Sequence, residues 1–323
     1  MRSPASRGVR GLAGLAAVVL LTGCGVAERE LPTAAEPSVE ATTPQPSALP
    51  SATASAATPP PAASAAATTT AASVPALKIQ SVSNFRDVAG KGTGLALASG
   101  HMAPGVVYRS GKLARLSSSD RRELAAAGIT DVYDLRTTKV ARRSPDRSIK
   151  GADYHLINLF GVYSTPSKTF RSISAARADR KRMNREFVAN AEQRRRTARV
   201  LTAIANADGP VIIHCTEGKD RTGWVSAVLQ LTAGASRKDV VAEYLLSNSY
   251  RKAEIAKRYA SVKRAKGTRA AKIDRVAYVV EAAFLNAGLA ELDKRYGTID
   301  TYLTKGLKLS AGTVEKLRDR LTA

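Results

Sequence analysis

The sequence predicts an α/β fold, in which a central, mostly parallel sheet is flanked by helices and followed by a helical C-terminal half. Short β-branched runs typical of buried strands occur at 106–108, 129–135 and 211–213. Segments with helical periodicity and recognisable caps separate these runs. From Thr222 onward, nearly every segment has a helical pattern. Strands that alternate with helices favour a parallel sheet covered by helices.

Residues 1–23 have the composition of a secretory signal peptide. Arginines precede an apolar run at 12–21, and the small residues Thr22 and Gly23 come directly before Cys24. The run is shorter than the ~20 residues that a stable membrane span requires. The segment resembles a bacterial lipoprotein signal, which implies acylation of Cys24 and attachment to the extracytoplasmic face of the cell membrane. The alternative is the cleaved signal of a secreted protein, in which Cys24 has no role.

Residues 24–76 predict a disordered tether rich in alanine, serine, threonine and proline. Ten of the 14 prolines of the chain lie within residues 1–75. Such a composition buries too little apolar surface to offset the entropy that is lost on ordering. We expect an extended tether that carries no chemistry, and its glycosylation is left open.

Residues 77–323 are enough for one catalytic domain with a sizeable core. Residues 1–76 carry four basic and four acidic side chains, so the whole formal net charge of +23 belongs to this domain. The chain has two cysteines and three histidines, which exclude a disulfide scaffold and a cysteine-rich zinc site and disfavour catalysis by a histidine-bound metal. We expect the domain to be a monomer.

Several helices of this domain can be placed from their caps. Ser117 and Asp120 form a capping box, which predicts a helix that ends at Gly128. An apolar stripe predicts one long helix over 184–206. A second capping box predicts a helix that begins at Ser236.

The chemistry is concentrated in the loop that follows the apolar run 211–213. Five residues separate Cys215 from Arg221, where a helix is expected to begin. Such a loop can turn its backbone N–H groups into one concavity, and the helix adds its positive end. The guanidinium of Arg221 can hold two oxygens of a phosphate. Because the same positive field favours a thiolate, we expect a depressed pKa for Cys215 and a nucleophilic sulfur.

The whole loop is a candidate for phosphate binding, and its residues are Thr216, Glu217, Gly218, Lys219, Asp220, Arg221 and Thr222. Gly218 would let the backbone approach the ligand closely. Thr222 could donate its hydroxyl to the sulfur. Lys219 has two interpretations that stay open: a second contact for substrates with more than one phosphate, or a solvated side chain.

His214, Cys215, Arg221, Thr222 and Gly223 together resemble the signature of the cysteine-dependent protein tyrosine phosphatases. The Gly-Lys-Asp-Arg sequence that ends at Arg221 is similar to that of a bacterial branch. That branch contains secreted or atypical tyrosine and dual-specificity phosphatases that also act on phosphoinositides. Further motifs that look like those of the branch lie, in order, at 84–90, 108–111, 134–136, 243–248 and 296–307.

The resemblance implies the protein tyrosine/dual-specificity phosphatase fold and hydrolysis of phosphomonoesters through a phosphocysteine intermediate, without a metal or other cofactor. Cys215 would attack phosphorus while Arg221 and the loop amides hold the equatorial oxygens. The expected substrates are phosphorylated proteins, phosphotyrosine first, with phosphoinositides close behind. The alternatives are an extracytoplasmic phytase-like phosphatase of inositol polyphosphates and a phosphate-binding module without turnover.

Three aspartates are candidates for the general acid. The resemblance favours Asp220, whose carboxylate would be held charged by Lys219 and Arg221 until a bound phosphate favours protonation. The alternatives are Asp87 and Asp179, because many family members take the acid from upstream of the loop.

Four residues near the loop are expected to support it: Arg86, Asp87, Asp134 and His214. For Asp87 we expect an ion pair that props the loop, in preference to a role in the chemistry for Asp87 or Arg86. We expect His214 to make a hydrogen bond that orients the loop, and Asp134 to form a buried pair with Arg136.

Two runs of the domain are strongly basic. Residues 171–199 contain ten basic and three acidic side chains, and residues 251–275 contain ten and two. The first could draw anionic substrate to the site, and either could lie on anionic lipid or cell-wall polymer. The alternative is a solvated surface. Because aromatic residues do not interleave with these runs, nucleic-acid binding is not expected.

Overall fold

The structure is a computed structural model that describes residues 77–161 and 169–322. The predicted signal peptide (1–23), the predicted tether (24–76) and the lipidation candidate Cys24 lie outside the described residues.

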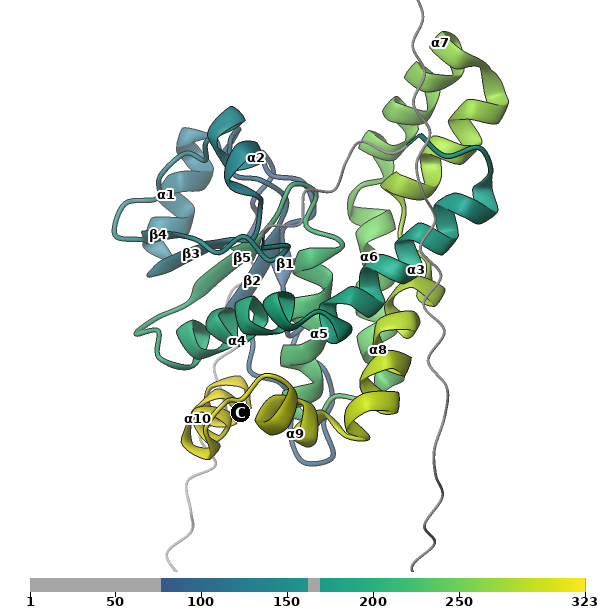
Figure 1. Cartoon of the computed structure of the whole chain (residues 1–323). Helices are drawn as coiled ribbons and strands as arrows, with labels where there is room; N and C mark the ends of the chain where they lie inside the picture. The colour runs from purple at the N-terminus through teal and green to yellow at the C-terminus, as the bar shows by residue number, and fades with distance from the viewer. Residues whose placement is uncertain (1–76, 162–168, 323) are drawn as a thin grey trace, which may run out of the picture. The chain divides into compact units, whose positions relative to one another are not determined.

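Five strands form one sheet in the order β1-β2-β5-β3-β4 (Figure 1). The pairs β2–β5, β5–β3 and β3–β4 are parallel, and β1 is antiparallel to β2. The strands are β1 (Arg86–Asp87), β2 (Val107–Ser110), β3 (Asp131–Asp134), β4 (Asp153–Leu156) and β5 (Val211–His214). The predicted fold class is confirmed, and β1 and β4 are additions to the prediction.

Helices surround this sheet and make up the C-terminal half, as predicted. They are α1 (Ser118–Ala126), α2 (Thr138–Arg143), α3 (Ile173–Ala189), α4 (Ala191–Ala205), α5 (Arg221–Ala233), α6 (Arg237–Tyr250), α7 (Lys252–Tyr278), α8 (Ala282–Tyr296), α9 (Ile299–Thr301) and α10 (Ala311–Leu321), with a π-helix at Tyr302–Gly306. The N-cap bond of both predicted capping boxes is present, because Ser117 and Ser236 accept hydrogen bonds from the N–H groups of Asp120 and Asp239.

One helix prediction is wrong. The segment 184–206 contains the end of α3 and all of α4, and the break lies at Asn190. Asn190 has an extended backbone (φ −81°, ψ 121°), and its side chain accepts a hydrogen bond of 3.1 Å from the N–H of Gln193. An N-cap bond of this kind satisfies a donor that the first turn of a helix leaves free. A new helix start is therefore stabilised inside the apolar stripe.

The sheet has a hydrophobic layer on each face because successive strand residues point in opposite directions. Ile212 packs in the layer that contains Leu124 of α1, whereas Val211 and Ile213 pack in the layer that contains α4 and α5. Figure 1 shows α1 and α2 on one side of the sheet and α4 and α5 on the other. Helix α5 is buried along nearly its whole length, which fixes the segment that follows β5.

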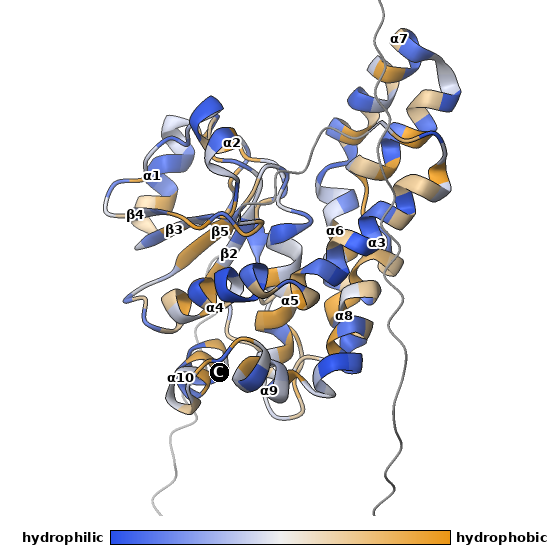
Figure 2. Cartoon of the chain, in the orientation of Figure 1, coloured by the Kyte–Doolittle hydropathy of each residue, from blue (hydrophilic) through white to orange (hydrophobic). Residues whose placement is uncertain are grey.

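The basic run 251–275 lies mostly on α7, which bends at Gly267 (φ 81°, ψ 169°). In Figure 1, α7 extends away from the sheet, and Figure 2 shows many hydrophilic residues on it. In the described part of the chain, no helix combines the length and the apolar character needed to span a membrane.

Candidate active site

The loop from Cys215 to Asp220 connects the C-terminal end of β5 to the first residue of α5, Arg221. The parallel pairs on both sides of β5 place this loop at the centre of one sheet edge, where ligands of such sheets bind. The side chain of Cys215 is only 2% exposed. A reacting group therefore has to enter the loop to reach the sulfur.

Side chains from outside the loop hold its carbonyl groups. The amide of Asn84 donates to the carbonyl oxygens of Gly218 (2.8 Å) and Glu217 (3.0 Å), and the guanidinium of Arg109 donates to Gly218 (2.9 Å). Because these carbonyl groups already accept hydrogen bonds from Asn84 and Arg109, the N–H groups of the loop are the backbone groups available to a ligand.

Glu243 on α6 connects two of the arginines behind the loop. Its carboxylate contacts the guanidinium of Arg86 and that of Arg109, each at 2.6 Å. Arg86 also donates to the side chain of Asn84. All four side chains are buried. Arg86 thus supports the loop indirectly, by its contacts with Glu243 and Asn84. The sequence motifs that contain these residues were recognised, but the contacts between the residues were not predicted.

The predicted ion pair of Asp87 is wrong. Its two carboxylate oxygens accept backbone hydrogen bonds from Ala89 (2.8 Å) and Gly105 (2.5 Å), and within residues 77–161 and 169–322 it has no ion-pair partner. Burial raises the pKa of Asp87 to about 6. That value would suit an acid, but both oxygens are engaged in holding a turn.

Gly218 is required by the packing of the loop. Its φ is +66°, and a Cβ atom there would lie 2.4 Å from the carbonyl of Ser110 at the end of β2. The close approach that only glycine permits is therefore to the neighbouring strand.

The surroundings of Cys215 favour its thiolate. Burial opposes ionisation, but the Arg221 guanidinium, followed by the hydroxyl and the N–H of Thr222, lowers the pKa of the thiol below its ordinary value. The buried hydroxyl of Thr222 has no other hydrogen-bond partner among the described residues. It is thus available to the sulfur.

Arg221 keeps its charge free for a ligand. Its guanidinium donates to the carbonyl of Leu135 (3.2 Å) and the hydroxyl of Thr216 (3.3 Å), and its carbon lies 4.7 Å from the centre of the Phe160 ring. No carboxylate of the described chain pairs with it. Stacking and neutral acceptors orient the guanidinium without neutralising it.

The second cation of the loop, Lys219, is buried and already paired. Its ammonium contacts the two carboxylate oxygens of Asp220 at 2.8 and 3.0 Å and lies 4.0 Å from Glu217. Glu217 also contacts Arg251 at 3.1 Å. Of the two interpretations of Lys219, neither a solvated side chain nor a free second phosphate contact fits this arrangement.

All three candidate acids have engaged carboxylates, and the two oxygens of Asp220 contact Lys219. Burial opposes ionisation of Asp220, but Lys219 and then Arg180 lower its pKa and so favour the charged carboxylate. Asp179, on α3, contacts the guanidinium groups of Arg180 and Arg182, each at 2.7 Å. Asp87 holds its turn. Only Asp220 lies within the loop itself.

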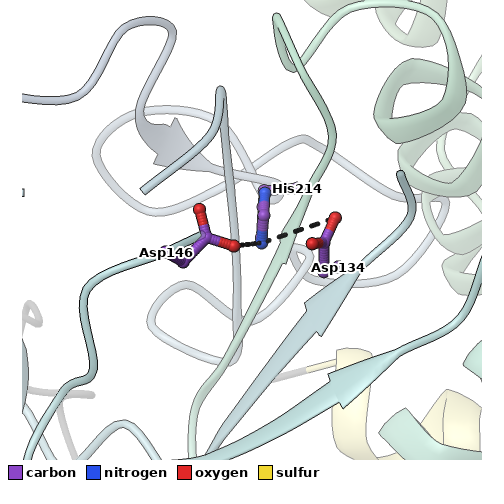
Figure 3. Close-up of side chains that lie close together, drawn as sticks. All are labelled: Asp134, Asp146 and His214. Carbon is purple, nitrogen blue, oxygen red and sulfur yellow. Dashed lines mark ion pairs between the residues drawn. The ribbon is translucent and has the colours of Figure 1, made fainter. Parts of the chain in front are cut away.

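Figure 3 shows a buried group that joins three segments beside His214, the residue before Cys215. The Nε2 atom of His214 lies 3.2 Å from a carboxylate oxygen of Asp146 and 3.9 Å from one of Asp134. The predicted pair of Asp134 and Arg136 is present at 2.6 Å, and Arg136 also contacts Asp146 at 2.6 Å. Because the guanidinium bridges both carboxylates, the group is a salt-bridge network and not a cation site. Asp146 was not predicted to belong to the site, and no sequence motif contains it.

A buried thiol that favours ionisation, a loop with free amides and an uncompensated guanidinium at a helix start are what a cysteine-dependent phosphatase needs. Comparison with known proteins agrees. Residues 77–323 match the tyrosine phosphatase family, and the chain belongs to it.

Relatives in this family include the triple specificity protein phosphatase PtpB of Mycobacterium tuberculosis, which is 33% identical in a 271-residue alignment that covers 73% of this chain and 95% of that protein. An inferred tyrosine-protein phosphatase of Cupriavidus necator is 28% identical over 238 residues, or 72% of this chain and 84% of that protein. The chain is a protein tyrosine phosphatase of the cysteine-dependent superfamily, as the sequence resemblance implied.

Proposed function

We propose that the domain hydrolyses phosphomonoesters in two steps on Cys215. The thiolate attacks phosphorus in line and forms a sulfur–phosphorus bond while the bond from phosphorus to the leaving oxygen breaks. Arg221 and the loop N–H groups stabilise the three equatorial oxygens, and water then cleaves the phosphocysteine to phosphate and free thiolate. The observation that carries this proposal is the buried thiol beside a guanidinium that has no carboxylate partner within residues 77–161 and 169–322.

Asp220 is the proposed general acid and base. A bound phosphate dianion adds negative charge beside its carboxylate and favours protonation. The acid gives its proton to the leaving oxygen in the first step. In the second step, the carboxylate takes a proton from the attacking water, so the group ends as it began.

Asp220→Asn should slow substrates with poor leaving groups by about 10²-fold and affect activated aryl phosphates much less, because only a poor leaving group needs the proton. The measurement is kcat for phenyl phosphate beside kcat for p-nitrophenyl phosphate. Asp87→Asn and Asp179→Asn are the matched variants. Suppose that Asp220→Asn loses activity equally on both substrates and that one of the other two variants loses it selectively on phenyl phosphate. The general acid would then be the residue changed in that variant.

The charges of the loop support a substrate with a single phosphate at the site. Arg221 is uncompensated, whereas Lys219 pairs with Asp220 and Arg251 pairs with Glu217. Phosphotyrosine therefore fits better than an inositol polyphosphate, whose additional phosphates would need further free cations. The name of the relative PtpB supports activity on more than one class of phosphate ester, and we propose phosphoserine, phosphothreonine and phosphoinositides as secondary substrates.

A substrate panel tests this proposal directly. The chain should turn over a phosphotyrosine peptide with a higher kcat/KM than inositol hexakisphosphate, and chelators should not change either value. The opposite order of the two substrates would favour the phytase-like alternative.

Glu217→Gln should change this preference. Removing the carboxylate frees the charge of Arg251 and part of that of Lys219, which adds attraction for additional phosphates. We expect the ratio of kcat/KM for inositol hexakisphosphate to that for the phosphotyrosine peptide to rise about fivefold. Glu291→Gln, which breaks another glutamate–arginine pair on α8, is the control. An unchanged ratio would show that Glu217 does not influence the preference between the two substrates.

We further propose that the chain is exported and held at the extracytoplasmic face of the cell membrane through a lipid on Cys24. The support is the signal-like segment 1–23 with a cysteine directly after it. Cys24→Ala should move the protein from the membrane fraction to the soluble fraction, as measured by immunoblotting after cell fractionation. Unchanged fractionation would argue for a secreted protein without an anchor.

A further inference from the structure

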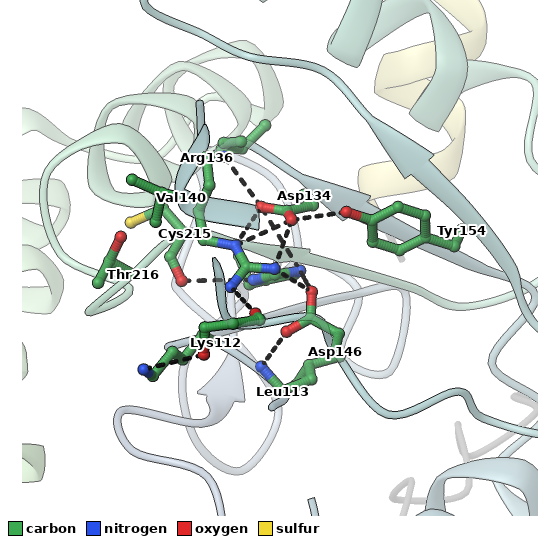
Figure 4. A network of polar contacts seen from close by, with 12 residues as sticks. Lys112, Leu113, Asp134, Arg136, Val140, Asp146, Tyr154, Cys215 and Thr216 are labelled. Carbon is green, nitrogen blue, oxygen red and sulfur yellow. Dashed lines mark hydrogen bonds and ion pairs between the residues drawn. The ribbon is translucent and has the colours of Figure 1, made fainter. Parts of the chain in front are cut away.

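Residues at or just beyond the C-terminal ends of three strands meet at one carboxylate, that of Asp146, which follows α2. One oxygen accepts a hydrogen bond of 2.8 Å from the N–H of Leu113, in the loop after β2. The other lies 2.6 Å from the guanidinium of Arg136 and 3.2 Å from Nε2 of His214. Figure 4 shows this carboxylate in a network of polar contacts that also includes Asp134, Arg136 and Cys215. Asp146 thus connects the ends of β2, β3 and β5.

The surroundings of His214 favour protons on both ring nitrogens. Nδ1 lies 3.3 Å from the carbonyl oxygen of Cys215, and Nε2, a buried atom that makes no hydrogen bond of good geometry within the described residues, lies 3.2 Å from a carboxylate oxygen of Asp146. A carbonyl and a carboxylate only accept hydrogen bonds. A neutral imidazole can donate from one nitrogen alone, so it would place a lone pair against one of these two acceptors.

The net charge of the buried group leads to the same conclusion. The side chains of His214, Asp134 and Arg136 have no exposed surface, and that of Asp146 is 5% exposed. Two carboxylates and one guanidinium leave one uncompensated negative charge, which is costly to bury. An imidazolium cancels it. Burial favours the neutral ring, but the carboxylates of Asp146 and Asp134 raise the pKa of His214.

We propose that Asp146 is a positioning residue of the phosphatase site, which keeps His214 doubly protonated directly behind the nucleophile. The imidazolium donates to the main chain of Cys215 and so orients the turn from β5 into the phosphate loop. It also places a positive charge one residue from the sulfur, which favours the thiolate. Asp146 acts through His214 and does not touch the substrate.

The other charged groups around His214 do not substitute for Asp146. On β3, Asp134 is held by Arg136 and accepts a hydrogen bond of 2.7 Å from Tyr154 on β4. It lies 3.9 Å from the ring. Arg136 itself opposes protonation of His214. The carboxylate of Asp146 is therefore the nearest anion to the ring and the one whose removal leaves His214 facing a guanidinium.

The first experiment observes the wild-type chain. With three histidines in the sequence, ¹⁵N side-chain spectra are resolvable, and His101→Gln and His155→Gln assign the remaining signal to His214. We expect both nitrogens of His214 to be protonated at pH 7.5. A single neutral tautomer at that pH would overturn the proposal, and this result does not depend on whether any variant folds.

The second experiment uses Asp146→Asn, which keeps an acceptor for the N–H of Leu113 but removes the charge. In a Cys24→Ala background, Cys215 is the only thiol, and its alkylation by iodoacetamide reports the thiolate fraction. We expect the alkylation rate at pH 6 to fall about tenfold, the acid limb of kcat/KM to move to higher pH, and the His214 signal to become neutral. A pH-independent loss of activity with an unchanged alkylation profile would show a merely structural role and overturn the proposal.

The matched control is Asp131→Asn. Asp131 begins β3 and pairs with His155 at 2.8 Å, but that pair is partly exposed. It should leave the alkylation profile of Cys215 unchanged. The proposal rests on the proposed role of Cys215 as the nucleophile. A failure of that role and a failure of the role of Asp146 give different results. If Cys215→Ser kept its turnover, the proposed mechanism would fail while the protonation of His214 and the alkylation profile would still be measured independently.

Discussion

Cys215→Ser should reduce kcat by at least about 10⁴-fold while leaving phosphate binding in place. A serine hydroxyl does not ionise at neutral pH, so the guanidinium of Arg221 and the contacts of Thr222 have no thiolate to stabilise. The replacement is nearly the same size, and the loop keeps its bonds to Asn84 and Arg109. The phosphate site should therefore stay assembled without a nucleophile.

Turnover of a phosphotyrosine peptide and calorimetric binding of inorganic phosphate test this result together. Cys24→Ala is the matched control, because it removes the other cysteine of the chain and should keep full activity on soluble substrates. Turnover above about one percent of wild type in Cys215→Ser would refute the nucleophile assignment. Loss of phosphate binding in the variant would instead show that the loop had rearranged.

Arg221→Lys should lower kcat/KM by about 10³-fold, the second largest effect that we expect. Lysine keeps one positive charge but cannot hold two equatorial oxygens with a planar fork, and it loses the stacking on Phe160. The thiol should also become harder to ionise, because Arg221 is the strongest influence that lowers its pKa. Since the thiolate then forms only at higher pH, the acid limb of kcat/KM should move upward in pH.

The measurement is the pH profile of kcat/KM for the phosphotyrosine peptide. Arg258→Lys is the control, because Arg258 on α7 also stacks on an aromatic ring, at 4.9 Å from the centre of Tyr278, and pairs with Asp274. It should stay close to wild type. A loss of less than tenfold in Arg221→Lys would mean that the loop amides alone stabilise the transferring phosphoryl group.

The parts of the fold that could be predicted are those with a local cause. The strand at 211–213 has a continuous β-branched run, and the helices at Ser117 and Ser236 have their caps within four residues. Strand β4 could not be predicted, because it is a polar edge strand held by pairing with β3. The break at Asn190 was missed, since a stripe of apolar residues continues across it.

The candidate site divides in the same way. Cys215 and Arg221 lie on one continuous loop, so their spacing alone places them around a common centre. Asp146 and Glu243 lie outside that loop in the sequence, and only tertiary contacts bring them to the site. The expected ion pair of Asp87 failed because charge by itself does not indicate which partner the fold brings near.

The sequence by itself determined the candidate reacting groups, the order of strand, loop and helix that presents them, and the family. These follow from short-range backbone geometry, in which a few consecutive residues set where amides, thiol and guanidinium point. Only the tertiary structure decided which charges remain free. It neutralises Lys219 with Asp220, joins Arg86 and Arg109 through Glu243 and, among the residues that the structure describes, leaves Arg221 without a carboxylate. Electrostatic compensation acts through space, so the folded arrangement determines it and the spacing of residues along the chain does not.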